Sequence, residues 1–461
     1  MHYLPEPLIK SLKAFHHFDE PAFRSVHASG ETVVSVRFNE AKLKIFNSDA
    51  SGPFNHPDFQ VASRVPWSSA GYYLTGRPSF TADPLFHAGL YYVQEASGMF
   101  LEQAMRQALD LSKPLRALDL CAAPGGKSTL IQSLISADSL LVSNEVIRTR
   151  VPALHQNLDK WGFGNGIVSN NDPAHFKAIE SFFDFIMIDA PCSGSGLFRR
   201  DNEAISEWSP ENVKLCSQRQ QRILADAWPA LKKEGILIYS TCSYSPEENE
   251  DILDYLLQQF DCETVRLTID PAWHIEETIS SAANGYGYRF YPDKLKGEGF
   301  FIAVLRKKDG TTGTAAAIRE KPDYANKKEQ EALRKYLPEE SLAFIRIPDG
   351  IHAFSPNRIS DLLLLKRHLY LKKAGVLAGQ LADEWIPEHE LALYVNLNRD
   401  IPAIELNRED ALKYLRRDPF DAKDPVKGWQ PVRFLGQNLG WVKVLTNRIN
   451  NYYPKSWRIL K

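Results

Sequence analysis

The fold of this chain is decided by the stretch Arg116–Thr129, RALDLCAAPGGKST. A short apolar run (116–120) leads into a loop of small residues and then into a helix-like pattern. Glycines in such a loop let a ligand approach the backbone closely, and the N-terminus of the following helix offers free N–H groups. The stretch therefore predicts a ligand-binding turn between a strand and a helix.

Further apolar runs and helix-like stretches alternate along the middle of the chain. The runs lie at 139–144, 182–189, 235–240 and 300–305, and the helix-like stretches lie at 127–136, 147–161, 210–233 and 247–259. This alternation is typical of a doubly wound α/β sheet with mostly parallel strands. Because ligands bind beyond the carboxyl ends of such strands, we expect functional residues directly after each run.

Two acidic residues follow predicted strands. Glu145 comes about twenty positions after the glycine-rich loop, which suits the two hydroxyls of a ribose. Asp172 follows a further short strand and is placed to recognise an adenine amino group. A helix N-cap role for Glu145 and a turn role for Asp172 are the structural alternatives.

Three thiols also follow predicted strands. Cys121 lies in the first loop, Cys192 lies three residues after the strand-ending Asp189, and Cys242 follows the run at 235–240. A small buried filler is the structural alternative for Cys192. Position alone does not divide roles among the thiols.

A Walker A phosphate loop, G-x-x-x-x-G-K-[ST], is the rival interpretation of the first loop. Gly126, Lys127 and Ser128 fit its end, but Cys121 stands where the first glycine is required. This mismatch disfavours a nucleoside triphosphatase.

The 461-residue chain carries 55 basic and 57 acidic residues, for a net charge of −2. This balance excludes a generally basic nucleic-acid-binding protein, although not a local basic surface.

Five cysteines without a C-x-x-C pair argue against a disulfide framework or a structural zinc site, so we predict no metal. No apolar stretch approaches the roughly 18–20 residues that span a bilayer, and no signal-peptide pattern is present. We expect a cytoplasmic protein without membrane contact.

Four motifs together resemble the Nol/Nop/Sun family of RNA cytosine-carbon-5 methyltransferases, over about residues 60–307. They are GLYYVQEASGMF (89–100), CAAPGGK (121–127), IDAPCSGSG (188–196) and STCSYSPEENE (240–250). The stretch 435–459 resembles the PUA-like RNA-binding tail of the bacterial members that modify small-subunit ribosomal RNA. Gly98 stands where the family often has a second serine, and 291–301 lacks a histidine often seen there.

The resemblance implies an α/β fold with a Rossmann-like S-adenosylmethionine-dependent methyltransferase sheet. Its expected parts are an N-terminal RNA-contacting α+β segment (1–110), the methyltransferase domain (111–307), a small, polar and charged linker (308–330) and a C-terminal region with a PUA-like RNA-binding domain (331–461).

The resemblance also assigns the chemistry. Cys242 would add to carbon 6 of cytosine, which makes carbon 5 nucleophilic. Asp189 would hydrogen-bond the polar edge of the base, Cys192 would assist release of the adduct, and Lys127 would support the electrostatics of the site. The expected cofactor residues are Cys121, Ala122, Ala123, Pro124, Gly125, Gly126 and Lys127, with Glu145 at the ribose, Asp172 at the adenine and Asp189 near the methionine end.

The expected substrate is 16S ribosomal RNA or the small ribosomal subunit, bound by a monomer. Alternatives are transfer RNA as substrate, DNA cytosine methylation, which uses a Pro-Cys thiol as nucleophile, and a non-catalytic RNA-binding ribosome assembly factor, which would need neither thiol.

The C-terminal end is the expected RNA anchor. Residues 311–461 contain 25 basic and 19 acidic residues, and no acidic residue follows Asp424. Cations there would contact phosphates, and the interleaved aromatic rings would stack on splayed bases. The alternative is that the rings fill the core of a small β-domain and the charges form a solvated face.

Overall fold

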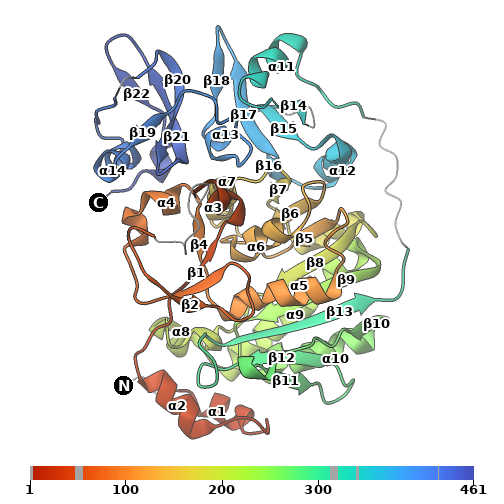
Figure 1. Cartoon of the computed structure of the whole chain (residues 1–461). Helices are drawn as coiled ribbons and strands as arrows, with labels where there is room; N and C mark the ends of the chain where they lie inside the picture. The colour runs from red at the N-terminus through yellow and green to blue at the C-terminus, as the bar shows by residue number, and fades with distance from the viewer. Residues whose placement is uncertain (1–3, 47–55, 312–319, 339–341, 424, 461) are drawn as a thin grey trace.

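The computed structural model describes residues 4–46, 56–311, 320–338, 342–423 and 425–460, and a large sheet lies at its centre (Figure 1). Five neighbouring strands are parallel: β9 (Leu231–Thr241), β8 (Phe183–Asp189), β5 (Arg116–Asp119), β6 (Leu140–Asn144) and β7 (Gly166–Ser169). The outer strands are antiparallel to their neighbours: β10 (Cys262–Thr264), β11 (Glu276–Ile279), β12 (Tyr286–Phe290), β13 (Phe300–Lys307) and β16 (Leu371–Ala374). Their order is β11-β12-β13-β9-β8-β5-β6-β7-β16, with β10 beside β13.

Helices cover both faces of this sheet. One face packs against α5 (Leu101–Ala108) and α6 (Gly126–Leu134), and the other against α9 (Pro210–Ala227) and α10 (Glu250–Gln259). Side chains of a strand alternate between the two faces. Leu118 of β5 accordingly joins the core with α9 and α10, whereas its neighbour Ala117 joins the core with α5 and α6.

The five predicted strands are present as β5, β6, β8, β9 and β13, which confirms the Rossmann-like α/β sheet. Two details differ from the prediction. Parallel pairing is confined to the centre of the sheet. The helix predicted over 210–233 ends at Ala227, because Pro229 has no N–H to continue the helical hydrogen bonds, and β9 begins at Leu231.

The strand β16 comes from beyond the predicted linker and extends the central sheet. It pairs with β7 through Leu371 opposite Ser169. Its buried Lys373 forms an ion pair of 2.9 Å with Asp159 and a second one with Glu390. The C-terminal region is therefore anchored to the methyltransferase sheet.

The N-terminal residues form a separate four-stranded sheet, ordered β2-β3-β1-β4. Its elements are α1 (Glu6–Leu12), α2 (Glu20–Ala28), β1 (Ser35–Phe38), α3 (Glu40–Phe46), β2 (Val61–Arg64), β3 (Gly71–Leu74), η1 (Phe80–Ala82), α4 (Pro84–His87), β4 (Tyr91–Val93) and η2 (Ser97–Phe100). Arg37 of β1 is buried and donates to the Thr129 hydroxyl of α6 at 2.6 Å. The N-terminal sheet thus contacts the helix that follows the first loop.

The C-terminal residues form two further sheets, β14-β15-β17-β18 and β19-β20-β21-β22. Their elements are α11 (Lys327–Arg334), β14 (Ala343–Ile347), β15 (Gly350–Phe354), η8 (Pro356–Arg358), α12 (Ile359–His368), β17 (Val376–Leu381), β18 (Trp385–Pro387), α13 (His389–Leu393), β19 (Ile404–Leu406), α14 (Arg408–Arg416), β20 (Gly428–Phe434), β21 (Gln437–Val444), β22 (Ile449–Asn451) and η9 (Lys455–Trp457). The last sheet shares a hydrophobic core with the N-terminal one, for example Val442 with Val36.

The predicted linker 308–330 includes 312–319, which lie outside the described residues, and α11 begins at Lys327. The domain boundaries remain predictions.

The remaining elements are α7 (Val151–Trp161), η3 (Pro173–Ala178), η4 (Ser195–Leu197), α8 (Asn202–Glu207), η5 (Trp228–Ala230), η6 (Pro246–Glu248) and η7 (Pro271–Trp273). No helix in the described part of the chain has the length and apolar character needed to cross a membrane.

Candidate active site

The carboxyl ends of β5, β8 and β9 bring the predicted polar residues together. Asp189 ends β8, and its Oδ2 lies 2.7 Å from Nζ of Lys127 at the start of α6. Ser240 of β9 donates to Asp189 Oδ1 at 2.6 Å. Burial acts to lower the pKa of Lys127, but the charge and hydrogen bond of Asp189, together with Asp119 and Cys242, outweigh burial, so the pKa lies above its usual value. Lys127 therefore stays cationic at the centre of the site.

Two of the predicted thiols lie against each other. The Sγ atoms of Cys192 and Cys242 are 3.0 Å apart, and both side chains are free thiols. The hydrogen bond to Cys242, together with burial, raises the pKa of Cys192 well above its ordinary value. At neutral pH Cys192 is thus a thiol rather than a thiolate, and it faces Cys242.

The loop 121–127 is held open by neighbouring side chains. Gly125 has φ +114°, a conformation that favours glycine, and Gly126 begins α6. Arg150 Nη2 donates to the carbonyl oxygen of Ala123 at 2.6 Å, and Asn157 Nδ2 donates to that of Pro124 at 2.8 Å. These bonds fix the loop, and the first N–H groups of α6, which have no partner within the helix, are available to a ligand.

Asp119, the last residue of β5, lies beneath this loop. Its Oδ2 accepts a hydrogen bond of 2.6 Å from Ser128, whereas its buried Oδ1 has no hydrogen-bond partner among the described residues. Burial raises the pKa of Asp119 to about 7. An unpartnered buried carboxylate oxygen next to a cofactor loop suits a cationic ligand group.

The two predicted recognition acids lie at the same edge of the sheet. Glu145 is buried after β6, where its Oε1 accepts from the N–H of Ile147 at 2.8 Å and its Oε2 lies 3.5 Å from Nη1 of Arg150. Asp172 caps η3 through the N–H of Ala174 at 3.0 Å. Asp172 thus has the turn role that was its alternative, and contacts of either acid with a nucleoside remain predictions.

Sequence reasoning gave no role to Asp119 or Arg37. Asp119 stands at the end of the first apolar run, directly before the quoted loop, so the rule of inspecting strand ends could have found it. Arg37 lies far from every motif, and nothing in the sequence links it to α6. Its burial, which lowers its pKa to about 9, depends on the packing of the N-terminal sheet.

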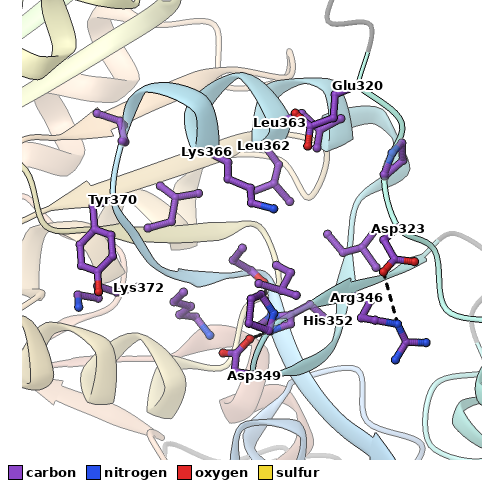
Figure 2. Close-up of a pocket in the computed structure, with 18 of the residues that line it drawn as sticks. Glu320, Asp323, Arg346, Asp349, His352, Leu362, Leu363, Lys366, Tyr370 and Lys372 are labelled. Atoms are coloured by element: carbon purple, nitrogen blue, oxygen red, sulfur yellow. Dashed lines mark hydrogen bonds and ion pairs between the residues drawn. The ribbon is translucent and has the colours of Figure 1, made fainter.

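A separate cavity of about 520 Å³ lies beyond β7, between α12, β14 and β16 (Figure 2). Tyr370 and Lys372 line one side of it, and the Arg346–Asp323 ion pair lines the other. None of the predicted site residues lines this cavity. It is therefore distinct from the thiol site.

One cluster near β16 has the residue types of a metal site, namely His155, Asp159 and Glu390. The Lys373 ammonium already pairs with both carboxylates of this cluster. The cluster is explained as a buried ion-pair network.

Most aromatic rings of the C-terminal tail are core residues. Trp429, Phe434, Trp441 and Tyr453 are buried, whereas Tyr452 is 44% exposed. Tyr452 lines an open groove of about 790 Å³ together with Arg417, Arg448 and Lys455. Cations and one exposed ring therefore remain for contact with RNA.

Three family models match the chain. The model of the 16S rRNA methyltransferase RsmB/F matches residues 106–306. The model of the N-terminal domain of 16S rRNA methyltransferase RsmF matches residues 4–96, and that of the methyltransferase RsmF PUA domain matches residues 401–459.

Relatives and solved structures agree with these matches. Ribosomal RNA small subunit methyltransferase F of Aliivibrio fischeri is 30% identical over 408 residues, which covers 85% of this chain and 84% of that protein. The protein of the same name from Aeromonas salmonicida is 31% identical over 451 residues, covering 91% and 90%. The crystal structure of a methyltransferase homologue from Pyrococcus horikoshii has a TM-score of 0.51 at 28% identity, covering 66% of this chain and all of that one.

Proposed function

Because this chain belongs to the RsmB/F family of 16S rRNA methyltransferases, we propose that it methylates carbon 5 of a cytosine in 16S ribosomal RNA. It is an S-adenosylmethionine-dependent ribosomal RNA methyltransferase by family and fold. The proposal of methylation at carbon 5 of cytosine rests on the pair of facing thiols, Cys192 and Cys242, beside the Lys127–Asp189 ion pair. A pure RNA-binding assembly factor would need neither thiol.

Carbon 5 of cytosine is a poor nucleophile, so the ring must be activated first. The Cys242 thiolate adds to carbon 6, which forms a sulfur–carbon bond and turns the ring into an enamine. The Lys127 cation would stabilise the negative charge that develops on the ring as the thiolate adds, and Asp189 would accept a hydrogen bond from the amino group at the polar edge of the base. Carbon 5 then attacks the methyl group.

Release reverses the addition. A water molecule accepts the proton of carbon 5, the double bond between carbons 5 and 6 forms again, and the Cys242 thiolate is expelled. Cys192 faces the same sulfur at 3.0 Å, so we assign it to this step. Its raised pKa keeps it protonated while Cys242 attacks, which leaves one of the two sulfurs as nucleophile.

S-adenosylmethionine supplies the methyl group when it is bound. The residues of the loop 121–127 fit this cofactor, and the unpartnered Oδ1 of Asp119 suits the cationic methionine end. We assign the ribose hydroxyls to Glu145 and the adenine to Asp172, both of which follow neighbouring strands of the sheet. Asp189 would lie nearest the transferred methyl group.

The target cytosine must leave any base stack to reach Cys242. The C-terminal groove with Arg417, Arg448 and Lys455 supports binding of the flanking RNA by its phosphates. Action as a monomer is part of the same proposal. The cytoplasm, where ribosomal RNA is modified, is the proposed location, and transfer RNA is the less supported substrate.

A denaturing gel with 16S rRNA and S-adenosylmethionine tests this mechanism. Cys242→Ala should give neither a protein–RNA adduct nor product, whereas Cys192→Ala should transfer the methyl group and then accumulate the adduct. Cys262→Ala changes a thiol on β10, outside the described site, and should behave like the wild type. An adduct from Cys242→Ala but none from Cys192→Ala would reverse the two roles, and methylation by Cys242→Ala would exclude covalent catalysis by this thiol.

A further inference from the structure

The two facing thiols come from loops that are separate in sequence but share one carboxylate. Each thiol is followed by a serine, Ser193 or Ser243. Glu248 accepts from the Ser193 N–H at 2.8 Å and from the Ser193 hydroxyl at 2.5 Å. The same carboxylate accepts from the Ser243 hydroxyl at 2.6 Å. Glu248 therefore joins the two thiol-bearing loops directly.

We propose that Glu248 is a positioning residue that holds Cys192 against Cys242 through Ser193 and Ser243. This role rests on the proposed function of the thiol pair. Because Glu248 acts on the loop that carries Cys192, we expect it to contribute to release of the adduct. The motif 240–250 therefore contains both the proposed nucleophile, Cys242, and the residue that positions Cys192, which is Glu248.

Burial makes this contact rigid. Glu248 is fully buried on η6, and Gln220 of α9 donates both to Glu248 Oε1 at 3.2 Å and to the carbonyl oxygen of Pro191 at 3.1 Å. Gln220 thus attaches the Pro191–Ser193 segment to the same carboxylate. Loss of one acceptor in such a buried network leaves several donors unpaired, so the loop must move.

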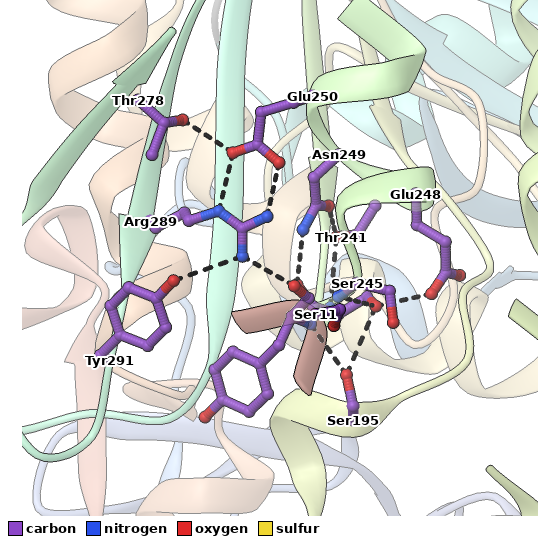
Figure 3. Close-up of polar contacts among 12 residues, drawn as sticks. Ser11, Ser195, Thr241, Ser245, Glu248, Asn249, Glu250, Thr278, Arg289 and Tyr291 are labelled. Carbon is purple, nitrogen blue, oxygen red and sulfur yellow. Dashed lines mark hydrogen bonds and ion pairs between the residues drawn. The ribbon is translucent and has the colours of Figure 1, made fainter. Parts of the chain in front are cut away.

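Cys242 has supports that do not depend on Glu248. Asn249 accepts from the Thr241 hydroxyl at 2.6 Å and donates to the Ser243 carbonyl oxygen at 2.8 Å. Gly196 N–H donates to the Cys242 carbonyl oxygen at 2.8 Å. Figure 3 shows Glu248 and Asn249 within one network with Thr241, Ser245 and Ser195. A change at Glu248 should therefore displace Cys192 more than Cys242.

The charge of Glu248 supports the same assignment. After the Cys242 contact and burial, the Glu248 carboxylate adds to the causes that raise the pKa of Cys192. Glu248 thus favours the protonated form of Cys192 as well as its position. Glu247, the preceding residue, is exposed and makes none of these contacts, so it offers a matched control.

The first test uses the full chain with 16S rRNA and S-adenosylmethionine. In Glu248→Gln the amide nitrogen cannot accept the serine hydroxyls, so turnover should fall by about tenfold or more while the protein–RNA adduct accumulates. Calorimetric affinity for S-adenosylmethionine should stay within about twofold, which shows that the variant is folded. Glu247→Gln should match the wild type. Turnover within about twofold of the wild type, or normal cofactor binding without any adduct, would overturn the proposal.

The second test needs neither RNA nor cofactor, because it follows Cys192 alone. In a Cys242→Ala background, iodoacetamide alkylation of Cys192 is measured against pH by mass spectrometry. Adding Glu248→Gln should move the midpoint of this profile down by about half a pH unit or more, since a nearby negative charge is lost. Adding Glu247→Gln should not move it. An unchanged midpoint would overturn the role of Glu248, whereas absence of an adduct in Cys192→Ala would refute only the proposed covalent mechanism.

Discussion

Replacing Asp119 by asparagine should remove the pH dependence of S-adenosylmethionine binding. Burial raises the pKa of Asp119 to about 7, and its Oδ1 has no hydrogen-bond partner among the residues described. The α-amino group of the cofactor is cationic below about pH 7.7. Because a carboxyl pairs with that cation only when ionised, binding should draw the proton from Asp119.

The size of the effect follows from this pKa. With a pKa of about 7, Asp119 is roughly half ionised at pH 7 and about 3% ionised at pH 5.5. Apparent affinity scales with the competent fraction of the protein, so the Kd should tighten about 15-fold between pH 5.5 and pH 7. At pH 7, binding should release about half a proton per site. Asp119→Asn should bind about 10- to 150-fold more weakly than the wild type at pH 7.

Isothermal titration calorimetry measures both quantities. Titrations at pH 5.5 and 7 give the change in Kd, and titrations at pH 7 in two buffers of different ionisation enthalpy give the proton count. Asp110→Asn changes an exposed aspartate and should keep the wild-type profile. A wild-type Kd that is the same at both pH values, or an Asp119→Asn variant with the full pH dependence, would refute the assignment of Asp119 to the cationic end of the cofactor.

Three further variants test the cofactor site, the RNA groove and the contact between sheets. Glu145→Ala should weaken S-adenosylmethionine binding by about 1.5–3 kcal/mol, roughly 10- to 150-fold, and unchanged calorimetric affinity would remove Glu145 from the site. The double variant Arg448→Gln, Lys455→Gln should lower the slope of log RNA affinity against log salt concentration by about 1.4, because two phosphate contacts are lost. An unchanged slope would show that these two cations face solvent and do not contact RNA. Arg37→Ala should lower the free energy of unfolding in urea by about 2–4 kcal/mol, because it removes the buried guanidinium that bonds Thr129, and a loss below about 0.5 kcal/mol would contradict that role.

Deleting the tail is a poor test of RNA binding. The strands β20 and β21 contribute Val432 and Val442 to the core that they share with Val36 of the N-terminal sheet. A chain lacking 425–461 would expose that core, so lost binding could not be assigned to the missing cations. Point substitutions at exposed cations avoid this difficulty.

The sequence predicted the centre of the molecule well, for a local reason. Each strand of the parallel centre is an apolar run that ends at a polar residue, as β8 does at Asp189. Both faces of such strands are buried, so they read as continuous apolar segments. The edge strand β16, LKKA, is half polar, and its Lys373 is buried only because Asp159 and Glu390 pair with it across the fold.

Sequence alone determined which segments of the centre are strands and which residues follow each of them, because burial of a parallel strand requires a pattern that is visible in the chain itself. Tertiary structure alone decided which side chains meet. The 3.0 Å contact of Cys192 with Cys242, the carboxylate of Glu248 between their loops and the orphaned oxygen of Asp119 all join separate segments. Contacts between segments depend on how the strands are ordered and packed, and this arrangement leaves no periodic trace in the sequence.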